Sequence, residues 1–140
     1  MKRTYDYRHI VTFRDTNLAG NVYFANHVAW QGVCREHFLR DHAPGVLQQL
    51  GAGLSLVTVS CQCEYLAELF VFDEVVIKLS LAEALHSRLD LRFDYMRTTA
   101  GSEELIAIGR NRITCMRRDG LQMLPQPIPE ELYTAALRYR

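Results

Sequence analysis

One long helical segment followed by four β-like runs constrains this chain more than any other feature. Residues 24–41 follow a helical pattern, and runs at residues 54–66, 74–84, 87–97 and 104–117 come after it with no helix between them. The third run alternates apolar and charged residues: Leu89, Leu91, Phe93 and Tyr95 against Arg88, Asp90, Arg92 and Asp94. Such alternation is typical of an antiparallel sheet with one face in water. The order therefore predicts a four-strand meander that packs on a single helix.

Shorter segments complete this pattern. Residues 5–13 alternate like a first strand, residues 14–21 are rich in turn formers, and residues 46–50 and 130–137 fit short helices. We expect one α+β domain over residues 1–140, because no linker or repeat divides the chain. Ala25, Ala29 and Gly32 form a stripe of small residues on the long helix. A glycine inside a helix costs about 1 kcal/mol relative to alanine, so the stripe predicts a curved sheet wrapped closely around the helix.

Composition excludes several classes of function. Lysine plus arginine and aspartate plus glutamate number 16 each, which argues against a basic nucleic-acid binder. No apolar run approaches the roughly 20 residues of a membrane span, and no apolar stretch follows the charged N-terminus, so we expect a cytoplasmic protein that contacts no membrane. The cysteines form no CxxC pair, which argues against a zinc site and favours buried free thiols: Cys34, Cys61, Cys63 and Cys115. We expect neither a metal nor a cofactor.

Residues 13–27, which read FRDTNLAGNVYFANH, resemble the active-site segment of the 4-hydroxybenzoyl-CoA thioesterase family. That family shows the pattern F-x-D-x-D-x-x-G-x-V, followed by two aromatic residues, one further residue and an asparagine. Residues 64–67 and 73–75 resemble the strand-turn-strand of the same family. The resemblance implies a hot-dog fold, in which an antiparallel sheet wraps around one long central helix, and it implies a thioester hydrolase.

One departure from the family pattern changes the expected chemistry. The family's catalytic acid is the second aspartate of D-x-D, and this chain has Asn17 there. A neutral amide cannot serve as a carboxylate nucleophile or general base. Asn17, with His27 and Arg35, is similar to the thioesterases of enediyne polyketide biosynthesis. That resemblance implies hydrolysis of a long unsaturated (polyene) β-ketoacyl thioester from an acyl carrier protein, after which the free β-keto acid can lose carbon dioxide.

The resemblance assigns the oxyanion site to the end of this motif. Asn17 can donate its side-chain amide to a carbonyl oxygen, and the Phe24 backbone amide is the family's oxyanion donor by position. The first N–H groups of a helix lack internal partners and carry the positive end of its dipole. We expect Gly20 to turn the loop back toward this amide and Tyr23 to contact substrate. From the residues alone, Asn17 also fits a turn former and the Phe24 side chain a core residue.

Two further side chains of the helix are catalytic candidates with open alternatives. Arg35 can stabilise the oxyanion or polarise a β-keto oxygen, or it can pair with Asp15 or Asp41. It lies about 16 Å along the helix from Phe24, at ~1.5 Å per residue. It therefore reaches the first N–H groups only if the loop around residue 17 runs back along the helix. His27 can orient a water or the substrate, or it can be a polar surface or core residue.

The strands offer candidates for contacts with partners. Glu64 can face the site from a second subunit, with Glu68 as a further acid, although strand carboxylates are usually solvated. Because a single sheet leaves uncovered edges, we expect a homodimer that assembles into a tetramer with active sites shared between subunits. A group of arginines can meet a phosphopantetheine phosphate or the acidic surface of a carrier protein, or form a solvated edge: Arg110, Arg112, Arg117 and Arg118.

Three other functions fit the same fold. A general acyl-CoA thioesterase is disfavoured by an asparagine at the acid position. A hot-dog dehydratase needs a histidine paired with an acid on a helix, and the residues around His27 show no such pair. A non-catalytic acyl-binding protein would lack the acid as well. Thiol release from model acyl thioesters separates a hydrolase from a binding protein.

Overall fold

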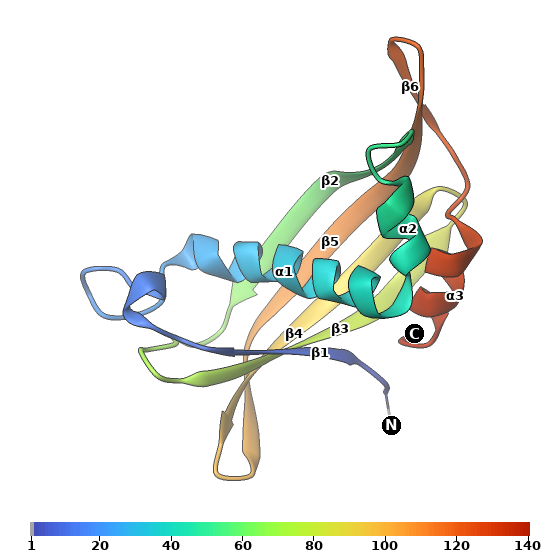
Figure 1. Ribbon diagram of the computed structural model, residues 1–140. Helices are drawn as coiled ribbons and strands as arrows, with labels where there is room; N and C mark the ends of the chain where they lie inside the picture. The colour runs from blue at the N-terminus through green and yellow to red at the C-terminus, as the bar shows by residue number, and fades with distance from the viewer. Residues whose placement is uncertain (1) are drawn as a thin grey trace.

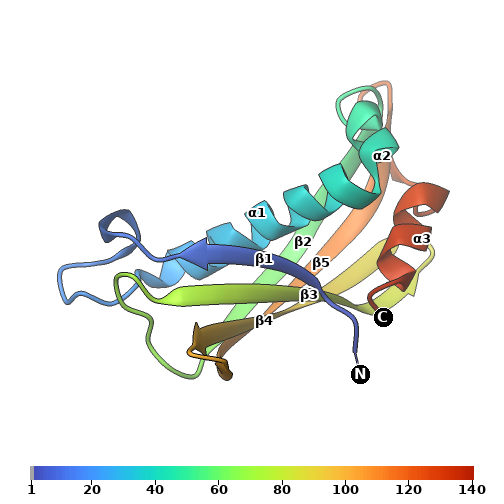
Figure 2. The same cartoon turned by 60° about the horizontal axis from the view of Figure 1, so that its bottom comes forward.

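The sheet of this chain curls around one long helix. A computed structural model describes residues 2–140, and Figures 1 and 2 show α1 lying across the concave side of the sheet. The strands are β1 (Tyr5–Ile10), β2 (Leu54–Tyr65), β3 (Glu74–Leu85), β4 (Arg88–Thr99), β5 (Ser102–Asp119) and β6 (Gln122–Pro125). The helices are the short 3-10 turn η1 (Phe13–Asp15), α1 (Phe24–His42), α2 (Pro44–Gln49) and α3 (Glu130–Leu137). This is the α+β hot-dog arrangement that the sequence predicts.

The strand order differs from the predicted four-strand meander. All pairs are antiparallel, and β3, β4 and β5 are consecutive neighbours, but β2 lies beyond β5 at the edge farthest from β1. The connection at residues 66–73 must therefore cross β5 and β4 before the chain enters β3. An extended chain covers up to ~3.4 Å per residue and adjacent strands lie about 4.8 Å apart, so this connection is long enough. Alternation reports the faces of a strand and not its neighbours, so the sequence pattern could not reveal this order.

Helix α1 buries one side against the concave face of the sheet. Trp30, Cys34 and Phe38 are each at most 5% exposed, and their i, i+4, i+8 spacing places them on one side of the helix. The predicted apolar face of β4 lies in the same core, with Leu89, Leu91, Phe93 and Tyr95 all buried. The core thus fixes how α1 lies relative to the strands that flank it.

The stripe of small residues on α1 does not face the chain's own sheet, which corrects the packing expectation. Ala25 and Ala29 are exposed and Gly32 is only partly buried. A Cβ placed on Gly32 would meet no atom within 4 Å. The physical reason is that the large residues of α1 lie on its other side, where their apolar area is removed from water.

Local chemistry corrects the boundary of the first strand. β1 ends at Ile10 rather than at residue 13, because the Asp15 carboxylate accepts a hydrogen bond from the Thr12 amide (2.9 Å) where the 3-10 turn η1 begins. At the other end of the chain, β5 continues to Asp119 and turns back into β6, a strand that the pattern does not separate. The predicted starts of α1 and α3 are observed, whereas α2 starts at Pro44, a first-turn position that proline favours.

The cysteines divide into two pairs by burial. Cys34 and Cys115 are buried free thiols, as expected, but Cys61 is exposed and Cys63 is partly buried. Both belong to β2, whose outer edge has no neighbour among the described strands, and this position explains their exposure. Among residues 2–140, no helix is long and apolar enough to cross a membrane.

Candidate active site

The loop before α1 folds back on itself. The Asn17 amide donates to the Asn21 carbonyl (2.9 Å), and the Gly20 amide donates to the Asn17 carbonyl (3.0 Å). Gly20 has a φ of 93°, a conformation that a residue with a side chain rarely adopts. The chain therefore turns at Gly20, as the sequence predicts, and a bridge between Thr16 and Val22 holds the two arms of the loop together.

The Asn17 side chain forms the turn and keeps a free donor. Its Oδ1 accepts a hydrogen bond from the Ala19 amide (2.8 Å), which fixes the orientation of the side-chain amide. Within residues 2–140, its Nδ2 donates to no partner, and the residue is exposed. The two interpretations of Asn17 are thus compatible, because the oxygen serves the turn while the nitrogen has no partner within residues 2–140.

The first turn of α1 presents unpaired amides. Tyr23 is the N-cap residue, and no side chain of the described residues caps the helix. The Asn26 backbone N–H donates to the Tyr23 carbonyl (2.9 Å), and the Asn26 side-chain Nδ2 donates to the Asp15 carbonyl (2.7 Å). The Phe24 N–H, at the first helical position, has no hydrogen-bond acceptor within residues 2–140. This end of the helix can therefore receive a developing negative charge.

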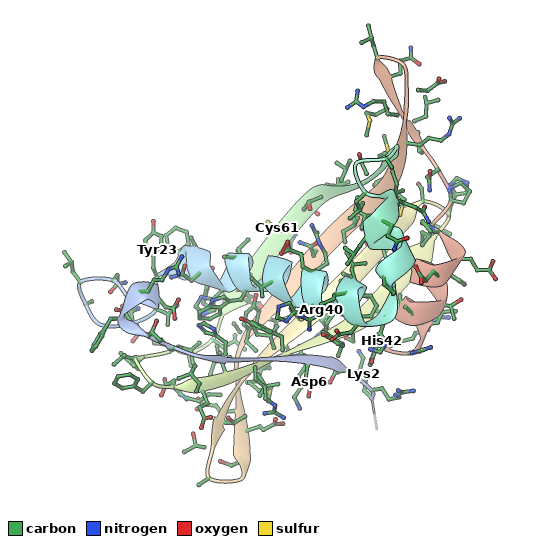
Figure 3. The ribbon with its side chains drawn as sticks, viewed as in Figure 1. Lys2, Asp6, Tyr23, Arg40, His42 and Cys61 are labelled. Carbon is green, nitrogen blue, oxygen red and sulfur yellow. The ribbon has the colours of Figure 1, made fainter. Side chains whose placement is uncertain are left out.

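Two aromatic side chains lie beside that helix end. The Phe24 side chain is 61% exposed, so it is not the core residue that the sequence allowed. The Tyr23 ring packs against it at 4.8 Å between centroids, and Figure 3 shows Tyr23 at the start of α1. The Tyr65 hydroxyl of β2 donates to the Phe24 carbonyl (2.6 Å), which ties the helix start to the edge strand.

Nearby carboxylates are already engaged. Asp15 accepts from His9 Nε2 and from the Thr12 amide, both at 2.9 Å. Burial by itself would raise the pKa of Asp15, but these hydrogen bonds outweigh it and hold the pKa below its ordinary value. Glu68 accepts from the Asn21 side-chain amide (3.2 Å) at the rim of the loop. Asp15 is therefore a structural carboxylate. Glu68 is a second acid whose side chain contacts the loop, through Asn21.

His27 lies in the core, one of the alternatives that the sequence left open, and its action on substrate stays a prediction. It is 3% exposed, and its ring packs against those of Trp30, Tyr65 and Tyr95 at 4.8–5.6 Å between centroids. Neither ring nitrogen has a hydrogen-bond partner among the described residues. Burial lowers the pKa of His27 to about 4. The ring is therefore neutral at pH 7, and in this conformation a substrate cannot contact its nitrogens.

Arg35 points from α1 toward β2 and β5. Its Nη1 donates to Thr58 Oγ1 (3.0 Å) and to Asn111 Oδ1 (2.8 Å). It pairs with neither acid considered from sequence, since Asp15 is held by His9 while Asp41 binds Arg40 and the Tyr5 hydroxyl. Burial lowers the pKa of the guanidinium, although Glu36 and Cys61 act in the opposite direction. Figure 3 shows Cys61 on β2, near the middle of α1. Within residues 2–140, Arg35 is a partly buried cation without a carboxylate partner.

One chain does not bring Arg35 together with Asn17 and the Phe24 amide. Eleven residues separate Phe24 from Arg35, which is about 16 Å along an α-helix. The loop at residues 16–22 lies beyond the N-terminal end of α1 and does not run back along it (Figure 1). The donors predicted to act together therefore form two groups within a single chain.

The remaining predicted residues lie on β2 and β5, and Glu64, Arg110 and Arg112 are on the face of the sheet away from α1. Glu64 lines a shallow pocket of about 290 Å³ there with Gln62, Ile108 and Arg110. Arg112 is bound by both oxygens of Asp90 (2.9 and 3.1 Å), whereas Arg110 forms no ion pair within residues 2–140. Arg117 and Arg118 are exposed near the β5–β6 turn. Glu64 is not on the α1 side of its own sheet, and its approach to a partner's site stays a prediction.

The sequence alone did not identify the residues that hold Arg35. Thr58 and Asn111 contact the guanidinium directly, and Gln31 contacts Asn111. The sequence feature that could have identified them is Asn111, a polar residue at a core-facing position of β5 between Gly109 and Ile113. A buried amide at such a position requires hydrogen-bond partners.

Comparison with known proteins gives one family. Residues 11–136 match the model of the Thioesterase-like superfamily. A relative from Aquifex aeolicus (strain VF5), described as a putative esterase, is 28% identical over 127 residues, which cover 90% of this chain and 95% of that protein.

Solved structures of similar proteins include two thioesterases. The dynemicin thioesterase, whose crystal structures describe polyene binding, is 49% identical with a TM-score of 0.93, covering 97% of this chain and 96% of that one. A variant of 4-hydroxybenzoyl-CoA thioesterase complexed with 4-hydroxybenzoyl-CoA has a TM-score of 0.83 at 19% identity, over 96% of this chain and 99% of that one. The second likeness shows the shared fold.

Protonation of His27 should cost folding free energy. Its pKa is about 4 in the folded protein and about 6.5 in an unfolded chain. Below pH 6.5 the unfolded chain therefore binds a proton that the folded protein does not, so stability falls by roughly 1.4 kcal/mol per pH unit toward pH 4. Between pH 7 and pH 5, denaturant unfolding should show wild type losing about 2 kcal/mol more than His27→Phe. Equal losses would mean that His27 ionises freely in the folded protein.

Proposed function

We propose that this chain, which belongs to the Thioesterase-like superfamily and is a thioester hydrolase, releases a long unsaturated β-ketoacyl group from an acyl carrier protein. The polyene substrate is inferred from the 49% identity with the dynemicin thioesterase, whose structures describe polyene binding, and the carrier from the resemblance of Asn17, His27 and Arg35 to the enediyne thioesterases. The carrier would belong to an enediyne polyketide synthase. The β-keto acid formed by hydrolysis then loses carbon dioxide.

The observation that carries this proposal is the set of donors at the start of α1. The Phe24 N–H and Asn17 Nδ2 are both free within residues 2–140. The acid position of the family is an amide, and Asp15 is committed to His9 and Thr12. A site of this kind stabilises an oxyanion and supplies no carboxylate nucleophile.

The proposed reaction needs only water and the thioester. The water oxygen bonds to the thioester carbon, and the electron pair of the C=O bond moves to its oxygen, which the Phe24 amide and Asn17 Nδ2 hold. The C–S bond then breaks as the C=O bond re-forms, and the sulfur receives the proton that the water loses. The β-keto group makes the thioester carbon more electrophilic. In the second step the C–C bond to the carboxylate breaks, carbon dioxide leaves, and the resulting enolate takes up a proton.

We infer that Arg35 joins these donors across an interface with a second subunit. Arg35 lies beside β2, and β2 is an edge of twelve residues without a charge before Glu64. Such an edge favours pairing with another chain, whereas the β1 edge is short and carries Asp6 and Arg8. A copy added at β2 brings the two Arg35 side chains to the dimer interface. We therefore place the shared site there, with the dimers paired as a tetramer.

Thiol release tests the activity directly. A β-ketoacyl-N-acetylcysteamine thioester, the same acyl group on coenzyme A and the group on a carrier protein should all release thiol, the carrier-bound form fastest. Mass spectrometry should find the methyl ketone left by decarboxylation. Equal rates for coenzyme A and carrier thioesters would favour a general acyl-CoA thioesterase. Binding without thiol release would identify an acyl-binding protein.

Restoring the family acid should weaken this enzyme. Asn17→Asp removes the free amide donor and adds negative charge where the oxyanion develops, and Asn17→Ala removes the donor alone. Loss of one oxyanion donor costs about 10²–10³ in turnover, so we expect both variants to fall by at least tenfold with folding intact. Glu68→Gln is the matched test of a carboxylate mechanism and should retain activity. Faster hydrolysis by Asn17→Asp, or inactivity of Glu68→Gln, would contradict the neutral-donor site.

Removing Arg35 should slow turnover without unfolding the protein. We expect Arg35→Ala to lower kcat at least tenfold, which is about 1.4 kcal/mol of transition-state stabilisation. Arg35→Lys should not restore the rate fully, because the planar fork is lost. Arg40→Ala is the control, since Arg40 is exposed on the same helix and pairs with Asp41. A near wild-type rate for Arg35→Ala would make this residue structural.

Charges on the β2 edge should separate the subunits. Val57 and Val59 are 41% and 58% exposed on that strand, and lysine on an edge strand opposes pairing with another chain. Sedimentation should find wild type as a dimer or tetramer at micromolar concentration, and the Val57→Lys/Val59→Lys variant as a folded, inactive monomer. Ile10→Lys places one lysine on the β1 edge as a control. Dissociation by the control alone would move the interface to β1.

A further inference from the structure

The Arg35 guanidinium is held by one of its nitrogens and is free at the others. An arginine side chain has five N–H donors in a planar fork. Nη1 uses its two, on Thr58 and Asn111, while Nε and Nη2 meet no acceptor within residues 2–140. The free edge of the fork carries two parallel donors, a geometry that suits two oxygens at once. A β-ketoacyl thioester and its enolate offer two such oxygens, on alternate carbons.

A chain of buried amides fixes the acceptor that orients this fork. Gln31 Nε2 donates to the Gln62 backbone carbonyl (3.0 Å), Asn111 Nδ2 donates to Gln31 Oε1 (3.5 Å), and Asn111 Oδ1 accepts from Arg35 (2.8 Å). A backbone carbonyl only accepts and a guanidinium only donates. Both ends of this hydrogen-bonded chain therefore impose the same donor-to-acceptor direction. If either side-chain amide flipped, two donors or two acceptors would face each other. Gln31 is 1% exposed and Asn111 7%, so water does not compete with these bonds.

The backbone of β5 makes room for this chain at Gly109. A Cβ at that position would lie 2.3 Å from Gln31 Nε2 and 3.1 Å from the Tyr95 ring. These contacts are too close for any side chain, so only glycine leaves the Gln31 amide in place. Gly109 thus leaves room for a continuous chain of hydrogen bonds, which runs from the Gln62 carbonyl through Gln31 and Asn111 to Arg35.

We propose that Gln31 and Asn111 are positioning residues that hold the Arg35 guanidinium with its Nε and Nη2 edge toward the substrate's two carbonyl oxygens. The inference rests on the proposed function, because it gives Arg35 a substrate to act on. It adds two residues that contact no substrate themselves and act through the arginine. Their removal should therefore matter only while Arg35 is present.

A double-mutant cycle tests this dependence. With the β-ketoacyl-N-acetylcysteamine thioester, Gln31→Met should lower kcat about fivefold or more and change KM by less than about threefold, since a positioned fork acts mainly in the transition state. In the Arg35→Ala background the same change should lower kcat by less than about twofold, because residues that act through one group are not additive. Gln48→Met, on exposed α2, is the matched control. Asn111→Ala is measured in the same cycle in case Gln31→Met does not fold.

The outcomes separate the two proposals. If Arg35→Ala loses at least tenfold while Gln31→Met and Asn111→Ala stay within twofold of wild type, the positioning role is wrong and the proposed function stands. Equal fold losses with and without Arg35 make the amides structural and also overturn the inference. Wild type that releases no thiol overturns the proposed function, and the inference with it.

Discussion

Burial of one side of α1 in the curled sheet is the constraint on which the rest of this structure depends. Trp30, Cys34 and Phe38 set the rotation of the helix about its axis, since they occupy the core. That rotation places Arg35 beside β2 and β5. The helix begins at Phe24, next to the loop at residues 16–22. The geometry of the chemistry is therefore a consequence of packing.

The proposed site differs in its electrostatics from a carboxylate site, because none of its donors carries a negative charge. In a site with an acid, a negative charge stands near the carbonyl before the reaction starts. In the site proposed above, the helix end, the Asn17 amide and the Arg35 cation all favour charge only as it develops on substrate. The one buried carboxylate near the loop, Asp15, is used to hold the turn. Such a site suits a substrate that is already activated.

Some of this could be predicted from sequence because it is local. The alternation from Leu89 to Tyr95 gave the faces of β4, and the motif placed the start of α1 at Phe24 and the turn at Gly20. Contacts between residues that are distant in the sequence could not be predicted in this way. Neither the position of β2 beyond β5 nor the enclosure of His27 by three aromatic rings leaves a periodic signal. The partners of Arg35 come from strands 23 and 76 residues away, so only the fold assembles them.

The place of β2 at the edge also has a consequence for how the chain is made. Its partner within the chain, β5, follows only after β3 and β4 have been synthesised. During that interval a strand that carries no charge before Glu64 is exposed with two free edges, and such segments aggregate readily. Non-local pairing of this kind is also slow to form. Even after β5 arrives, the other edge of β2 has no neighbour among the described strands, so with the proposed dimer the yield of active protein depends on how quickly subunits find each other.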